Sequence, residues 1–475
     1  MSMKNSLSLC ALFLTQACLY SPHSEAQVKA KPIFAEQSLA QQKKFYNFNN
    51  LCLGKKENCR PPQFVNMGFD GAKSNSMYYK TRQFAKEHNI QFTYFASAVY
   101  FLRRDSKKGD FSHLHYNAPK KGVGRSNIGF GDSLDDVRTR YRHMTMAHEE
   151  GHEIASHAVG HFYGGAPNKW KKDALNWTSS QWASEFTYFD KFLKGGYANF
   201  GGLFTGLGIK KSQSQISKEI SQNIVGFRAP QLSYNSSMFS ALASKGFKYD
   251  TSKSQGRDRW PRRGEKGIWN FALGIIPVSG YGNIISMDYN LHVKKVPADV
   301  AIKAYLKYFR DNYNGNRAPV HLGHHFAAYG GYVKEDPKFW YVLKKVSEKI
   351  CGLPEVFCTS FRNLETFMSS APASALTRFQ KGQFAKGKSV HVAAHLNDNL
   401  SESALPSSAL GFASPAALSV SPADSLEVVA ELDDVATSAY TPFPEISLIE
   451  KKRLENEASC GSHKDALEGG AHSLS

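Results

Sequence analysis

Side chains able to bind a metal ion and move protons follow separate apolar segments that have the composition of strands. His157 and His161 stand four residues apart after the short apolar run "EIAS". Other such runs end in an acid, an arginine or paired histidines: Asp70, Arg228, Asp250, His324 and His325. Neutral imidazoles bind divalent metals through nitrogen, and a gap of four residues lets two of them reach one ion. With an acid and an arginine nearby, this is the set needed for metal-assisted hydrolysis.

Short apolar runs alternate with amphipathic stretches between residues 60 and 371, which predicts strands that alternate with helices. One helix is expected to begin after Ser133 as N-cap, with Asp136 in the capping-box position, and to close at Gly151. Parallel strands need connections of a dozen or more residues, which helices supply. Seven or eight such units predict an α/β fold, namely a distorted (β/α) barrel of about seven parallel strands.

In a (β/α) barrel the active site lies at the carboxyl ends of the strands, where side chains from distant segments meet. The residues named above are therefore expected to converge at one end of the barrel. Residues 102–132 and 194–222 interrupt the alternation and are interpreted as long loop insertions.

The beginning of the chain predicts export. Residues 1–26 contain Lys4, an apolar stretch and a small-residue pattern that ends at Ala26, which is typical of a signal peptide. The protein is therefore expected in the periplasm or outside the cell. Processing at Cys18 to a lipid-anchored form is the alternative, although "LTQAC" is a poor signal for it. No later apolar run is long enough to span a membrane.

Composition divides the chain into four regions. After the signal peptide, residues 27–59 form an N-terminal extension and residues 60–371 the barrel. Residues 372–475 are a low-complexity stretch rich in Ala and Ser and poor in aromatic residues, so this tail is expected to be disordered.

Four of the seven cysteines lie in two close pairs, which suits an exported protein. Cys52 with Cys59 and Cys351 with Cys358 predict two local disulfides, with a zinc knot as the alternative.

Positive charge is concentrated in the middle of the chain. The net charge is +18, and residues 373–475 hold 8 basic against 13 acidic side chains, which leaves +23 over residues 27–372. Such a surface favours a polyanionic glycan partner, or is simply a solvated basic face. No recognised nucleic-acid-binding motif is present, so no nucleic-acid partner is expected.

Five motifs resemble those of the polysaccharide deacetylase family, also called the NodB homology domain or carbohydrate esterase family 4, over roughly residues 60–370. "GFDG" (68–71) is similar to TFDD, "SHAVGH" (156–161) matches H(S/T)xxH, and "FRAP" (227–230) matches RxP. "YDTS" (249–252) and "NRAPVHLGHHF" (316–326) look like YDSS and like NRAP followed by LxH, as in a divergent branch that includes the animal chitin deacetylases.

The resemblance implies removal of acetyl groups from N-acetylated amino sugars, with a divalent ion, most plausibly Zn²⁺, held by His157 and His161. Asp70 would take a proton from water, and Arg228 would keep that carboxylate ionised. The substrate would be a polymer containing GlcNAc or MurNAc, in the first place peptidoglycan.

Which histidine would act as the acid is left open between two neighbours. The LxH spacing selects His324, whereas an ungapped match from Arg317 selects His325, and the first is preferred. Four further residues are expected to lie at the substrate: Pro230, Asp250, Asp288 and Leu322.

One position departs from the family pattern, because Gly71 stands where the second aspartate, a metal ligand, is usual. Three outcomes are open: two histidines and water hold a weaker metal, Asp288 completes the site, or the domain binds glycan without hydrolysing it. The leading hypothesis is a metal-dependent N-deacetylase, and the alternative is a non-catalytic carbohydrate-binding protein on the same fold.

Overall fold

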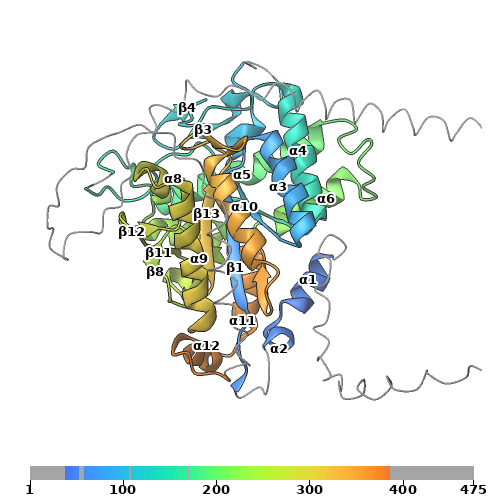
Figure 1. Ribbon diagram of the computed structural model, residues 1–475. Helices are drawn as coiled ribbons and strands as arrows, with labels where there is room; N and C mark the ends of the chain where they lie inside the picture. The colour runs from blue at the N-terminus through green and yellow to red at the C-terminus, as the bar shows by residue number, and fades with distance from the viewer. Residues whose placement is uncertain (1–37, 53–57, 106–108, 170, 386–475) are drawn as a thin grey trace, which may run out of the picture. The chain divides into compact units, whose positions relative to one another are not determined.

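A curled, mainly parallel sheet organises the fold (Figure 1). The computed structural model describes residues 38–52, 58–105, 109–169 and 171–385. Seven strands pair in parallel in the order β13-β1-β2-β5-β6-β7-β10, β16 pairs with β1, and β9 closes one edge antiparallel. This arrangement confirms the predicted distorted (β/α) barrel.

The strands of this sheet are short, apart from β1 and β13. Their bounds are β1 Gln63–Gly71, β2 Thr93–Ala96, β5 Glu153–Ser156, β6 Gly226–Phe227, β7 Tyr249–Asp250, β9 Arg262–Arg263, β10 Trp269–Asn270, β13 Val320–His325 and β16 Val356–Cys358. Smaller sheets are formed by β8 Ser254–Gly256 with β11 Leu273–Val278 and β12 Gly282–Ile285, by β3 Asn117–Ala118 with β4 Gly122–Val123, and by β14 Tyr332–Val333 with β15 Asp336–Pro337.

Helices connect the parallel strands and cover the outer face of the sheet (Figure 1). They are α3 Asn75–His88, α4 Leu134–Glu149, α5 Ser179–Asn199, α6 Gln213–Gln222, α7 Ser236–Ser244, α8 Asp288–Val293, α9 Ala298–Asn314 and α10 Lys338–Ile350. Helix α11 Phe361–Ser370 follows the last strand and packs on the inner side, where Phe361 contacts Phe95. Two short N-terminal helices, α1 Leu39–Phe45 and α2 Phe48–Leu51, pack near α11, and α12 spans Ala373–Gln380. None of the helices in the described ranges is both long and apolar enough to cross a membrane.

The register between β1 and β13 decides which side chains share a face. Asp70 lies opposite His325, and Phe69 lies opposite His324. Because successive side chains of a strand point to opposite faces, Asp70 and His325 share the inner face of the curled sheet. Phe69 and His324 point outward to the helices, where Phe69 contacts Trp340 of α10.

Local signals at the ends of α4 agree with the prediction in part. Ser133 caps the helix by accepting a hydrogen bond from the backbone nitrogen of Asp136 at 3.0 Å, and Gly151 has a φ of +87°. The expected capping box is wrong, because the Asp136 carboxylate instead accepts from the backbone nitrogen of Asp132 and pairs with Arg140. The nearby guanidinium is the stronger partner for that carboxylate.

The two pairs of cysteines form disulfides, Cys52 with Cys59 and Cys351 with Cys358, as expected. The second predicted insertion, 194–222, is only partly a loop, since α5 extends to Asn199 and α6 occupies Gln213–Gln222. The signal peptide, Cys18 and residues 386–475 lie outside the described residues.

Packed structure continues beyond residue 371, where the sequence places the start of the tail. The aromatic ring of Phe379 in α12 is fully buried and lies 5.1 Å from that of Trp260. The backbone nitrogen of Trp260 also donates to the Gln380 side chain at 2.8 Å. Helix α12 is therefore part of the folded body.

Replacing Phe379 by Ala is expected to lower the free energy of unfolding by about 3–5 kcal/mol, because a buried aromatic ring leaves a cavity. Chemical denaturation followed by tryptophan fluorescence measures the change, with the exposed Ser374→Ala as control. Equal stability of the two variants would show that α12 contributes nothing to the cooperative unit.

Candidate active site

His157 follows β5 on a short loop that holds its ring in one orientation. Its backbone nitrogen donates to Ala96 at 2.8 Å, and its ring Nδ1 donates to the carbonyl oxygen of Arg228 at 2.8 Å. A proton on Nδ1 leaves the Nε2 lone pair available, which is the arrangement found in metal-ligating histidines. The backbone of Arg228 therefore selects the tautomer that a metal requires.

His161 completes the imidazole pair on the same loop. Its ring centroid lies 5.1 Å from that of His157, and its Nδ1 is buried without a hydrogen-bond partner among the described residues. Its φ of +58° is rare for a residue with a side chain, and Ala158 on this loop shares that value. Such backbone strain is often concentrated at functional sites.

Both imidazoles are neutral at pH 7. Burial is the largest cause, and it lowers the pKa of His157 to about 3 and that of His161 to about 4. Because a metal ligand must offer a lone pair, neutral rings at physiological pH fit a divalent cation.

A buried ion pair joins β1 to the loop after β6. Arg228 Nη1 donates to Asp70 Oδ1 at 2.6 Å, and Arg228 Nε donates to Thr251 Oγ1 at 2.6 Å. The guanidinium carbon lies 4.3 Å from the centre of the Phe95 ring, so the aromatic face also stabilises the cation. Arg228 is fully buried, and its geometry fixes the direction of Asp70.

Asp70 is ionised despite its burial. Burial alone would raise the pKa of its carboxyl group, but the charge of Arg228, together with His157 and His325, lowers the pKa below its usual value. A carboxylate kept ionised beside the imidazole pair can accept a proton from a nearby water molecule.

His325 and Asp288 form a second acid–base pair. His325 Nδ1 donates to Asp288 Oδ1 at 2.7 Å, and its Nε2 lies 4.0 Å from Asp70 Oδ2. Burial lowers the pKa of His325, but the charge and hydrogen bond of Asp288 and the charge of Asp70 outweigh it and raise the pKa above the usual value. His325 therefore carries a proton to higher pH than an ordinary histidine.

The sequence-based preference for His324 over His325 is corrected by this geometry. His324 lies on the outer face of β13, with its ring 5.9 Å from that of Tyr305 in α9, and is almost fully buried. Of the two histidines, His325 is the one that faces Asp70. Adjacent residues of a strand point to opposite faces, so a choice between neighbours depends on register.

Three other predicted substrate residues are buried within the fold. Both carboxylate oxygens of Asp250 accept from Ser252, whose hydroxyl accepts from the backbone nitrogen of Ala229 at 2.8 Å. Burial raises the pKa of Asp250 to about 6. Asp250 thus positions the segment that carries Arg228, and both of its carboxylate oxygens are engaged within the fold. The other two buried residues are Leu322 in the core and Pro230 at the start of a single helical turn.

Gly71 offers no side chain to the imidazole pair. Its φ is +77°, a conformation that glycine adopts without strain. Asp288, the suggested replacement, is engaged by the ring and backbone nitrogens of His325. The possibility that Asp288 completes the metal site is therefore not supported by its contacts.

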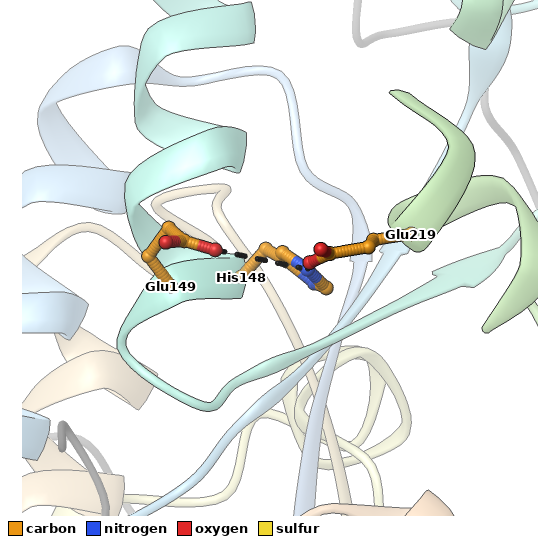
Figure 2. A group of neighbouring side chains, drawn as sticks. All are labelled: His148, Glu149 and Glu219. Carbon is orange, nitrogen blue, oxygen red and sulfur yellow. Dashed lines mark hydrogen bonds and ion pairs between the residues drawn. The ribbon is translucent and has the colours of Figure 1, made fainter. Parts of the chain in front are cut away.

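A three-residue group with metal-ligand chemistry does occur elsewhere in the described residues. His148 and Glu149 at the end of α4 approach Glu219 of α6, and their ligand atoms lie within 4.8 Å of one another (Figure 2). However, the Lys211 ammonium lies 3.1 Å from Glu149 and 2.8 Å from Glu219. Lys211 already bridges both carboxylates, so we interpret the group as an ion-pair network that joins two helices.

Comparison with known proteins finds similarity in structure only. No protein-family model and no curated protein matches this chain. A candidate polysaccharide deacetylase from Mycobacterium smegmatis is 14% identical, covering 71% of this chain and 96% of its own, with a TM-score of 0.35. A family 4 carbohydrate esterase from Streptomyces lividans in complex with acetate is 10% identical, covering 62% of this chain and 91% of its own, with a TM-score of 0.30.

A family 4 pseudoenzyme from Bacillus anthracis is 9% identical, covering 64% of this chain and 66% of its own, with a TM-score of 0.34. Similarity at this level assigns no activity. The site must be judged by its own residues.

Replacing Arg228 by Met is expected to lower the free energy of unfolding by about 3–5 kcal/mol at neutral pH, because it leaves a buried carboxylate unpaired. In the wild type, the lowered pKa of Asp70 contributes stability that is complete above the usual value of 3.8 and is lost as the pH falls through the folded value. The variant should lose this dependence and instead recover stability as Asp70 becomes protonated. Urea unfolding at acid and neutral pH measures both effects, and parallel curves would contradict the role of Arg228.

Proposed function

We propose that this protein is an exported, metal-dependent N-deacetylase that hydrolyses the acetamide of GlcNAc- or MurNAc-type residues in a glycan polymer. The observation that supports this most is the convergence of two neutral imidazoles, an ionised carboxylate and a histidine of raised pKa at one sheet edge. Peptidoglycan is the favoured substrate because residues 27–372 carry a net charge of +23 and its peptides are acidic. Two disulfides suit an oxidising compartment.

His157 and His161 would hold the divalent ion, most plausibly Zn²⁺. Their neutral rings and the unpartnered Nδ1 of His161 fit that group. When bound, the ion would act as a Lewis acid toward the acetamide carbonyl and lower the pKa of the attacking water. The loop after β5 supplies both rings, so the ion and the scissile amide would meet beside Asp70.

Asp70 and His325 divide the proton transfers between them. Asp70, kept ionised by Arg228, accepts a proton from the attacking water. His325, kept protonated by Asp288, donates a proton to the departing sugar amine. His325 Nε2 lies 4.0 Å from Asp70 Oδ2, so the proposed donor and acceptor are close neighbours. Environments that separate two pKa values in this way assign the base and the acid.

The alternative is a carbohydrate-binding protein without activity. It is favoured by one observation, the glycine at position 71 where a third protein ligand would otherwise stand. Both hypotheses use the same residues at the sheet edge, so the two are separated by product formation alone.

Acetate release from purified peptidoglycan or N-acetylglucosamine oligomers tests the proposal. We expect the wild-type protein supplied with metal to release acetate. Acetate release should be lost when a chelator is added and in the variant His157→Ala. In His325→Gln the rate of acetate release should fall about 10²- to 10⁴-fold, which is the usual contribution of a general acid. His324→Gln, the matched control on the neighbouring residue, should change the rate by only a few-fold. If none of these polymers yields acetate, the deacetylase proposal is contradicted and the carbohydrate-binding alternative remains.

The pH dependence tests the His325–Asp288 pair separately. As the pH rises through the pKa of His325, the imidazole loses the proton that it must donate, so kcat/KM should fall on the alkaline side. Asp288→Asn removes the charge that raises this pKa, and should move the alkaline limb to lower pH. An unchanged limb would mean that another group is the acid.

A further inference from the structure

A buried carboxylate accepts a hydrogen bond from the backbone of the loop that carries the two histidines. Glu185 of α5 is fully buried, and its Oε2 accepts a hydrogen bond from the backbone nitrogen of Val159 at 3.1 Å. Val159 lies midway between His157 and His161. Burial raises the pKa of Glu185 to about 7, and hydrogen bonds from Tyr116, Val159 and Gly160 oppose that rise.

Tyr116 fixes the other oxygen of this carboxylate. Its hydroxyl donates to Glu185 Oε1 at 2.6 Å, and the ring is fully buried. Tyr116 belongs to the insertion 102–132, and so does Asn127, which also contacts the loop. The backbone nitrogen of Asn127 donates to the Gly160 carbonyl at 3.0 Å, and its side-chain amide donates to the His161 carbonyl at 3.2 Å. Side chains and backbone of the insertion thus supply several of the hydrogen bonds that hold the loop in place.

Close packing at Gly160 shows how tightly the loop is seated. A Cβ atom at this position would lie 2.6 Å from the Tyr116 hydroxyl and 2.5 Å from the Phe162 ring. Ala158 and His161, on either side, both have positive φ angles near +58°. A conformation of this kind costs free energy, and it persists only where surrounding contacts determine it.

We propose that Glu185, oriented by Tyr116, is a positioning residue that sets the geometry of the His157–His161 pair. It does not touch the metal or the substrate. The carboxylate accepts the amide hydrogens that the bent loop cannot satisfy internally, so the loop is already shaped before a cation arrives. The role rests on the proposed function, because it concerns the same imidazole pair.

Cobalt binding and hydrogen exchange of the full chain test this role. Glu185→Leu keeps the size of the side chain but removes both acceptors, and Glu185→Gln keeps one carbonyl oxygen for Val159. Tyr116→Phe removes the hydroxyl that orients the carboxylate. Tyr141→Phe is the matched control, because Tyr141 is also buried and also bonds to α5, through the carbonyl of Phe192, away from the loop.

We expect Glu185→Leu to weaken Co²⁺ affinity about 10- to 100-fold, as removal of outer-shell partners does elsewhere. Glu185→Gln should restore most of that loss, Tyr116→Phe should show a smaller loss, and Tyr141→Phe should bind as the wild type does. In the metal-free protein, amide exchange of the loop peptide should be faster in Glu185→Leu and Tyr116→Phe than in Tyr141→Phe.

Unchanged affinity and exchange in both Glu185→Leu and Tyr116→Phe would overturn the inference while leaving the proposed function intact. A wild-type protein that binds no Co²⁺ would instead overturn the metal site, and the exchange measurement would still decide whether Glu185 shapes the loop. If Glu185→Leu does not fold, the comparison of Tyr116→Phe with Tyr141→Phe decides the same question.

Discussion

The buried pair between Arg228 and Asp70 is the constraint on which the site depends. Removing two charges from water is costly, and the attraction between them offsets that cost only in good geometry. The fold provides this geometry through three contacts of Arg228. Its Nη1 donates to Asp70, its Nε donates to Thr251, and its guanidinium lies over the ring of Phe95. The backbone carbonyl of the same residue orients the His157 ring. One residue therefore sets the charge of Asp70 and the tautomer of His157.

From this constraint follows a site with three histidines whose pKa values are shifted in opposite directions. At His157 and His161 the effect of burial outweighs the opposing charge of Asp70, so their pKa values are lowered. His325 lies between two carboxylates, of which Asp288 accepts its Nδ1 hydrogen, so its pKa is raised. Lewis-acid binding needs neutral rings, and amine departure needs a protonated one. The pKa values differ because, of the three rings, His325 is the one that also donates to Asp288.

The sequence predicts the parts of the site that depend on strand ends. Apolar runs mark where strands stop, so Asp70, His157 and Arg228 can be found from pattern alone. His325 is not the preferred acid by sequence because its neighbour His324 has the same chemistry, and one position of register separates the two faces. Glu185 has no local signal, since a carboxylate in a helix is ordinarily solvated. Phe379 is hidden by the Ala- and Ser-rich composition around α12.

Position 71 differs from the motif it resembles in backbone conformation as well as in side chain. At Gly71 the chain turns with a φ of +77°, and its carbonyl accepts from Ser97 at the end of the neighbouring strand. Any L-residue there would be strained by a left-handed conformation, although aspartate tolerates it better than most. Asp70 cannot readily serve in its place, because Oδ1 is held by Arg228 and Oδ2 is the oxygen left to accept a proton. In the proposed metal site the two imidazoles would therefore be the protein ligands, so their preset geometry would matter more than in a site with three protein ligands.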